Sequence, residues 1–142
     1  MLKVLLVDDH AVVRIGLARI LRDAYADVVI GEADDGPRAI ELAVGQPWDV
    51  IVLDVSMPTL NGIETLKALR RLNVTARILM LSMHAGRPYV LGSFKAGAAG
   101  YLSKESAPDE LVEAVNTVLA GRAYLSRSLA EAGASLELNT SA

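Results

Sequence analysis

The chain has no cysteine among its 142 residues, which excludes disulfide bonds and thiolate metal sites and makes a reducing cytoplasm the expected location. It has no apolar run near the ~18 residues that span a membrane, and its first residues lack the pattern of a signal peptide. It also has no excess of positive charge, since 14 Lys and Arg face 17 Asp and Glu, for a net charge of −3. The sequence therefore predicts a single domain with neither a membrane segment nor a basic surface for nucleic acid.

In place of long apolar runs the chain has five short ones. The strands that they predict are Val4–Val7, Val28–Ile30, Val50–Leu53, Ile78–Leu81 and Gly100–Leu102. Stretches with the apolar spacing of a helix follow each run, ending near Ala24, Val44, Leu72, Ala96 and Leu119. Strands this short and apolar are typical of a parallel sheet that is buried on both faces. Five β/α units with right-handed crossovers predict an α/β fold with a doubly wound, five-stranded parallel sheet.

Residues able to do chemistry follow four of these strands. Asp8 and Asp9 follow the first strand, Asp54 the third and Ser82 the fourth, while Lys104 comes two residues after the fifth. In an open α/β sheet the ligand crevice lies outside the carboxyl ends of the strands, so these side chains are expected to converge there. Three carboxylates, a hydroxyl and an ammonium group fit a divalent cation together with a phosphoryl group.

The residue types assign roles within this set. Asp8 and Asp9 repel each other unless a cation lies between them and Asp54, and without one at least one carboxyl pKa is expected to rise. Mg²⁺ is the expected cofactor, because it prefers carboxylate, carbonyl and water oxygens and binds substrate phosphate. Asp54 is the preferred nucleophile toward phosphorus, with Lys104 and Ser82 supplying positive charge and a hydroxyl donor for the phosphoryl oxygens.

Each of these residues also has a simpler interpretation. A single Asp at a strand end is more often a turn former or a helix cap, and Lys104 or Ser82 alone would be an ordinary solvated side chain. His10 is more simply a residue at the start of a helix than a metal ligand, and Tyr101 and Trp48 are more simply packing residues. The functional interpretation depends on all these residue types occurring together at the strand ends.

Four motifs resemble the receiver domain of two-component response regulators. They are Val7-Asp8-Asp9-His10, Leu53-Asp54-Val55-Ser56-Met57-Pro58 with Asn61-Gly62, Leu81-Ser82, and Gly100-Tyr101-Leu102-Ser103-Lys104. The resemblance covers about Leu2 to Gly121 and implies a flavodoxin-like or CheY-like (βα)5 fold with strand order 2-1-3-4-5. The Asp-Asp-His start and the segment Leu81–His84 are most similar to the NarL/FixJ-like branch, whose members carry a C-terminal LuxR-type helix-turn-helix.

The resemblance also implies a role for each site residue. Asp54 is the phosphoacceptor; Asp8, Asp9, Asp54 and the Ser56 carbonyl hold Mg²⁺; Ser82 and Lys104 contact the phosphoryl group; Ser82 and Tyr101 form the switch; Ser56 and His84 tune dephosphorylation. The implied partners are a sensor histidine kinase and, after phosphorylation, a second copy of the chain. The protein would not be an enzyme in the usual sense but a signalling phosphoacceptor that catalyses its own phosphorylation and dephosphorylation.

The resemblance also predicts how the chain divides into a receiver domain and a linker. Residues 1–122 are the expected receiver domain, and residues 123–142 a linker, with a short helix over Arg127–Ala132, toward a DNA-binding domain that these residues do not include. Contact with DNA would occur only through that domain. One departure from the family pattern is Glu105, because many receivers have a proline after the lysine, in a cis peptide.

Three other classes of protein fit the sequence less well. A flavodoxin-like cofactor protein would need a Gly/Ser/Thr loop after the first strand, where Asp8 and Asp9 would repel phosphate. A haloacid-dehalogenase-like phosphatase would need a second Asp two residues after Asp8, where this chain has His10. A degenerate receiver that acts only as a binding module would not need the full set of acids, hydroxyl and lysine.

Overall fold

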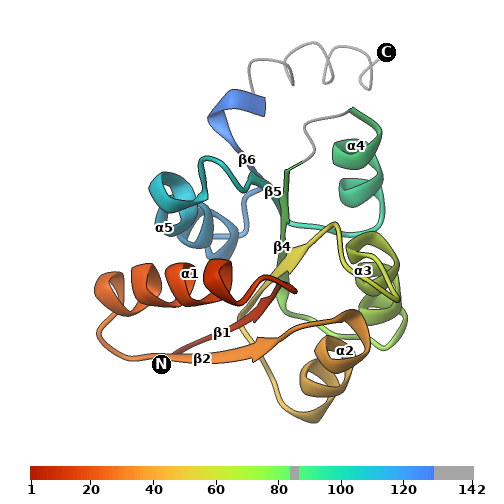
Figure 1. Ribbon diagram of the computed structural model, residues 1–142, viewed down its shortest axis with the longest axis horizontal. Helices are drawn as coiled ribbons and strands as arrows, with labels where there is room; N and C mark the ends of the chain where they lie inside the picture. The colour runs from red at the N-terminus through yellow and green to blue at the C-terminus, as the bar shows by residue number, and fades with distance from the viewer. Residues whose placement is uncertain (84–86, 130–142) are drawn as a thin grey trace.

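The computed structural model describes residues 1–83 and 87–129 and contains a six-stranded parallel sheet in the order β2-β1-β3-β4-β5-β6 (Figure 1). The strands are β1 (Leu2–Val7), β2 (Val28–Ala33), β3 (Val50–Asp54), β4 (Arg77–Ser82), β5 (Gly100–Ser103) and β6 (Tyr124–Leu125). The predicted order of the first five strands is confirmed, but the predicted number of strands is wrong. The sixth strand pairs in parallel with β5 and has only two residues, too few to show the alternation that marks a strand in a sequence.

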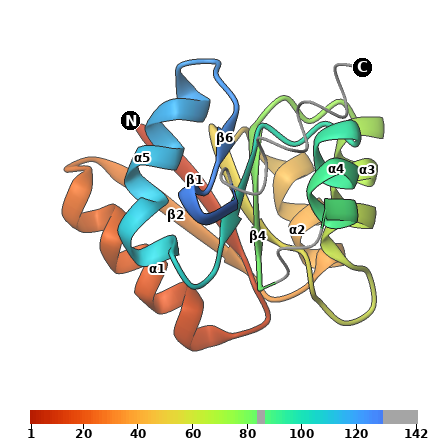
Figure 2. The same cartoon turned by 90° about the horizontal axis from the view of Figure 1, so that it is seen from above.

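Within the described residues, the helices α1 to α5 cover both faces of the sheet. They are α1 (Ala11–Ala24), α2 (Gly36–Gly45), α3 (Gly62–Arg71), α4 (Arg87–Lys95) and α5 (Ala107–Leu119). Figure 2 shows α1 and α5 on one face and α2, α3 and α4 on the other. No helix in the described ranges has the length and apolar character needed to cross a membrane.

The central strand β3 illustrates why the strands are almost wholly apolar. Ile51 and Leu53 belong to the hydrophobic cluster under α2, α3 and α4, whereas Val50 and Val52 belong to the cluster under α1 and α5. All four side chains are buried. A strand that contributes to a core on each face has no polar face, which explains the continuous apolar runs of the sequence.

Two local features place α3 against the end of β3. Asn61 caps α3 in a capping box with Glu64, as its position before the helix predicts. Gly62 then lies so close to β3 that a Cβ atom there would be 2.2 Å from the carbonyl oxygen of Asp54. Only glycine permits this approach, so the start of α3 is fixed beside the functional end of β3.

Candidate functional site

The register of the sheet brings two acidic residues together at its carboxyl edge. Val7 of β1 lies opposite Leu53 of β3, so the next residues, Asp8 and Asp54, are neighbours. Each of these two aspartates is only 1% exposed. Two adjacent buried carboxylates are unfavourable unless positive charge compensates them, so this arrangement indicates a functional site.

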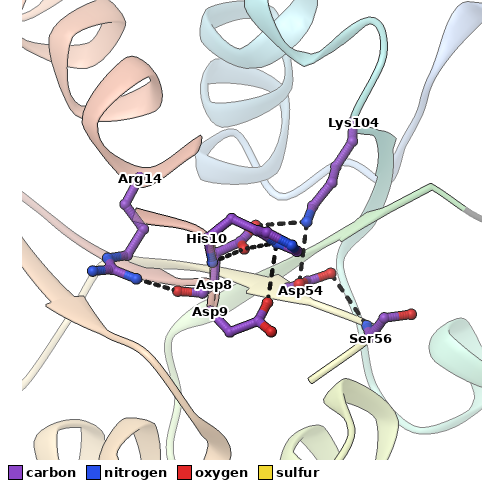
Figure 3. Close-up of polar contacts among 7 residues, drawn as sticks. All are labelled: Asp8, Asp9, His10, Arg14, Asp54, Ser56 and Lys104. Atoms are coloured by element: carbon purple, nitrogen blue, oxygen red, sulfur yellow. Dashed lines mark hydrogen bonds and ion pairs between the residues drawn. The ribbon is translucent and has the colours of Figure 1, made fainter. Parts of the chain in front are cut away.

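Four side chains form a cluster of the size of a cation site. Asp8, Asp9, His10 and Asp54 each offer one ligand atom, and these atoms lie within 4.8 Å of one another. Figure 3 shows the three carboxylates converging on one another from β1 and β3. Three carboxylates are the donors that a hard divalent cation such as Mg²⁺ prefers, so the donor set fits that ion. His10 lies in the cluster, although its sequence position alone gave no reason to prefer a metal-binding role.

Lys104 supplies the positive charge nearest to the two buried acids. Its Nζ atom is 2.9 Å from Asp8 Oδ2 and 3.2 Å from Asp54 Oδ2 (Figure 3). Burial opposes the charged form of Lys104, but the interactions with Asp8 and Asp54 outweigh it and raise its pKa. The described residues contain no cis peptide bond, so Lys104 reaches the site with a trans bond to Glu105.

The Asp54 carboxyl is strongly perturbed. Burial and the negative charge of Asp8 raise the pKa of Asp54 to about 6. The charge and hydrogen bond of Lys104 and the hydrogen bond from the Ser56 N–H lower this pKa, but by less. The Ser56 N–H donates to Asp54 Oδ1 over 3.2 Å. The expected rise of at least one carboxyl pKa in this cluster is confirmed. At neutral pH Asp54 is still ionised, as a carboxylate nucleophile has to be.

The loop between β1 and α1 holds Asp8 by both its side chain and its backbone. The His10 N–H donates to Asp8 Oδ1 over 2.8 Å, and His10 Nδ1 lies 3.1 Å from that oxygen and 3.1 Å from Asp9 Oδ1. The Arg14 guanidinium donates to the backbone carbonyl of Asp8 and to Glu32, 3.0 Å away. The helical pattern predicts a solvent-facing Arg14, but its side chain is only 17% exposed.

The remaining candidate residues lie on or after β4 and β5. Ser82 ends β4 and Tyr101 lies in β5, and both side chains are buried. Burial, opposed by a hydrogen bond with Ser82, raises the pKa of Tyr101. The N–H of Lys104 donates to the Ser82 carbonyl over 2.9 Å, which joins the two strand ends. His84, the predicted partner of Ser56 in rate tuning, lies outside the described residues.

Comparison with known proteins agrees with this arrangement. The family model for the response regulator receiver domain matches residues 4–116. The chain is 40% identical over 131 residues to the response regulator UvrY of Escherichia coli K12, and 39% identical over 126 residues to the nitrate/nitrite response regulator protein NarL of the same organism. These matches cover 92% and 89% of this chain and 60% and 58% of the relatives. The chain thus spans about three fifths of their length.

A solved structure is similar over nearly the whole chain. The LuxR-family two-component response regulator from Aurantimonas sp. SI85-9A1 superposes with a TM-score of 0.89 and 38% identity, covering 96% of this chain and 97% of that one. The chain belongs to the response regulator receiver domain family. It is the receiver domain of a two-component response regulator, as the sequence motifs predict, and this decides against the flavodoxin-like and phosphatase alternatives.

Proposed function

We propose that this domain accepts a phosphoryl group from a sensor histidine kinase onto Asp54 in a Mg²⁺-dependent reaction, and that the phosphorylated domain controls transcription. The observation that supports this most strongly is the buried Asp54 carboxylate, which lies between a cation-sized cluster of acids and the ammonium group of Lys104. A degenerate receiver that only binds a partner would have no use for two buried, adjacent carboxylates.

The proposed chemistry is a displacement at phosphorus. A carboxylate oxygen of Asp54 forms a bond to phosphorus while the bond from phosphorus to the donor histidine nitrogen breaks, and the donor leaves with that electron pair. Asp8, Asp9, Asp54 and the Ser56 carbonyl would hold Mg²⁺, which when bound would supply positive charge for the phosphoryl oxygens. Lys104 turns from Asp8 and Asp54 toward the new phosphoryl oxygens, and the Ser82 hydroxyl donates to one of them.

A hollow beside the acids suits the approach of the phosphodonor. It is lined by Asp9, Val55, Ser56, Met57, Asn61, Ile63 and Tyr89. These residues belong to the loops after β1 and β3, to the start of α3 and to α4. A donor in this position would reach Asp54 without displacing Lys104.

Asp54→Asn is expected to abolish phosphorylation. Incubation with a small phosphodonor and Mg²⁺ should add the mass of one phosphoryl group to the wild-type chain and none to the variant, because an amide is not a nucleophile toward phosphorus. Asp34→Asn is the matched control, since Asp34 is an exposed aspartate just after β2 and is outside the acidic cluster. Loss of labelling in both variants, or in neither, would contradict the assignment of Asp54.

Ser56 and His84 are proposed to tune the lifetime of the phosphoryl group. Each follows an active-site residue by two positions in the sequence, and the family resemblance favours a role for both in the access of the hydrolytic water. Replacing either is therefore expected to change the dephosphorylation rate more than the phosphorylation rate, as measured by the decay and the growth of phosphorylated protein. Equal changes in both rates would refute this placement.

Phosphorylation is proposed to act by dimerisation. The family resemblance favours a symmetric contact through α4, β5 and α5, which would place two copies of any attached DNA-binding domain on a palindromic site. Tyr89 of α4 is 42% exposed and suits such a contact. Sedimentation at tens of micromolar should detect a dimer only when a phosphate mimic and Mg²⁺ are present. A persistent monomer would remove dimerisation as the output of this domain and leave the role of Asp54 intact.

A further inference from the structure

The segment after α5 is built into the domain. We name Tyr124–Leu129 the β6 segment; it contains β6 and one helical turn. The N–H of Tyr124 donates to the Ala99 carbonyl over 3.1 Å, and the N–H of Ser126 donates to the Tyr101 carbonyl over 3.0 Å. Part of the predicted linker is therefore an edge strand of the sheet (Figure 1). Leu125 of β6 lies opposite the predicted switch residue Tyr101 of β5.

A buried carboxylate of α5 anchors this segment. Glu110, which is 3% exposed, accepts a hydrogen bond from the Tyr124 hydroxyl and another from the N–H of Arg127, over 3.1 Å. Burial opposes ionisation of Glu110, but the hydrogen bonds from Tyr124, Ser106 and Arg127 together hold its pKa below the ordinary value. A buried carboxylate with these donors is costly to leave unpaired, so the segment is held by more than its short strand pairing.

The contact surface is shaped for the segment. A Cβ atom on Gly100 would lie 2.8 Å from Leu79 Cδ1 and 3.0 Å from the Tyr124 carbonyl oxygen, so glycine suits the close packing of this position against both β4 and β6. The Ser126 hydroxyl, wholly buried, accepts from the Ser103 N–H over 2.9 Å. At the far end Leu129 is 6% exposed and belongs to the same hydrophobic cluster as Tyr101.

The segment thereby supports one position of the switch residue. Tyr101 is fully buried, and it shares a hydrogen bond with Ser82. The family resemblance implies that Ser82 and Tyr101 form the switch, and in this structure the Tyr101 side chain already points inward, where it is fully buried. β6 pairs with the backbone of β5 at Tyr101, and the buried Leu129 side chain belongs to the same hydrophobic cluster as Tyr101, so docking of the segment favours the buried position of the Tyr101 side chain.

We propose that the β6 segment is an intramolecular effector of the receiver, and that its docking on α5 and β5 and the phosphorylation of Asp54 strengthen each other through the inward position of Tyr101. This inference rests on the proposed function of Asp54. By thermodynamic linkage, if the docked segment raises the affinity of the site for a phosphoryl group, occupation of the site strengthens docking by the same factor. The strength with which the segment docks would then depend on whether Asp54 is phosphorylated.

Two variants on α5 separate this proposal from a general effect on the helix. Glu110→Ala removes the buried acceptor of the Tyr124 hydroxyl and the Arg127 N–H. Glu113→Ala is the matched control, because Glu113 is exposed on the same helix and contacts the same Arg127, through a 2.7 Å ion pair at the surface. A third variant, Tyr124→Phe, is milder than Glu110→Ala because it removes only the hydroxyl group that donates to Glu110. Urea denaturation shows which variants remain folded before they are compared.

The first measurement is hydrogen exchange of the Tyr124 and Ser126 amides in the wild-type chain, with and without beryllofluoride and Mg²⁺. The mimic is expected to slow both amides by about fivefold or more, the lower end of common allosteric couplings. The second measurement is the affinity for beryllofluoride. It should fall by the same factor in Glu110→Ala, fall less in Tyr124→Phe, and be unchanged in Glu113→Ala.

The outcomes distinguish this inference from the proposed function. If beryllofluoride binds the wild-type chain but leaves the exchange of Tyr124 and Ser126 unchanged, the coupling is refuted and the role of Asp54 stands. Unaltered affinity in a folded Glu110→Ala variant whose segment exchanges freely would also refute it. If the wild-type chain binds beryllofluoride no better than Asp54→Asn does, the proposed function itself fails.

Discussion

Lys104→Met is expected to lower the free energy of unfolding at neutral pH by about 3 kcal/mol in the absence of metal, because removing one partner of a buried ion pair leaves its opposite charge uncompensated. In this domain two buried carboxylates, Asp8 and Asp54, would lose the ammonium group that lies 2.9 and 3.2 Å from them. The pKa of Asp54, already raised to about 6, should rise further without the charge of Lys104. Urea denaturation of both proteins in a chelating buffer measures the loss.

The dependence of this stability loss on pH and on Mg²⁺ tests whether lost charge compensation is its cause. Near pH 5 protonation of Asp54 should remove much of the repulsion, and Mg²⁺ should do so at neutral pH, so the loss should shrink in both conditions. Lys67→Met is the control, since Lys67 is exposed on α3 and should change stability by less than about 0.5 kcal/mol. A loss that is the same at every pH and Mg²⁺ concentration would indicate lost packing rather than lost charge compensation.

Asp54→Asn is expected to stabilise the metal-free domain at neutral pH by roughly 1–3 kcal/mol. The folded-state pKa of Asp54, about 6, lies above the ordinary value of 3.8. The folded state therefore binds this proton more tightly than the unfolded state does. The contribution of Asp54 to stability is greatest below pH 4 and is lost as the pH rises from about 4 to 6. Asparagine does not ionise and escapes this loss.

The stability difference between the two proteins should consequently depend on pH. It should be smallest near pH 4, grow toward pH 6 and remain constant above it, as measured by denaturation in a chelating buffer. Mg²⁺ should reduce the difference at neutral pH because it compensates the carboxylates of the wild-type chain. Asp34→Asn, an exposed substitution outside the acidic cluster, is the matched control for the substitution itself. A difference that does not change between pH 4 and pH 7 would contradict the raised pKa of Asp54.

Much of the site was predictable because parallel strands end at a common edge. Asp8, Asp54 and Lys104 follow apolar runs that are recognisable as strands, and the crossover rule then places the ends of those strands together. The approach of the acids and the ammonium group therefore follows from local patterns and a general rule of topology. The position of Tyr101 was harder to predict, because burial against its neighbours sets the orientation of a side chain within a strand.

Other functional features have no local signal. β6 is two residues long, Glu110 occupies a helical position where a charged residue usually faces solvent, and the apolar spacing of α1 assigns Arg14 to the solvent side. Each is defined by a partner far along the chain or in another element: β5 for β6, Tyr124 and Arg127 for Glu110, and Glu32 for Arg14.

The sequence by itself determined the α/β class and the residues at the carboxyl ends of the strands, because apolar periodicity and strand-end chemistry are local. The order of the first five strands came from the resemblance of the motifs to the receiver family. Only the tertiary structure decided that the sheet has a sixth strand, that Glu110 holds it, and that Arg14 fixes the backbone of Asp8. The physical reason is that a short strand, a buried carboxylate and a half-buried guanidinium are stable only with particular distant partners, and no local pattern specifies which residues those partners are.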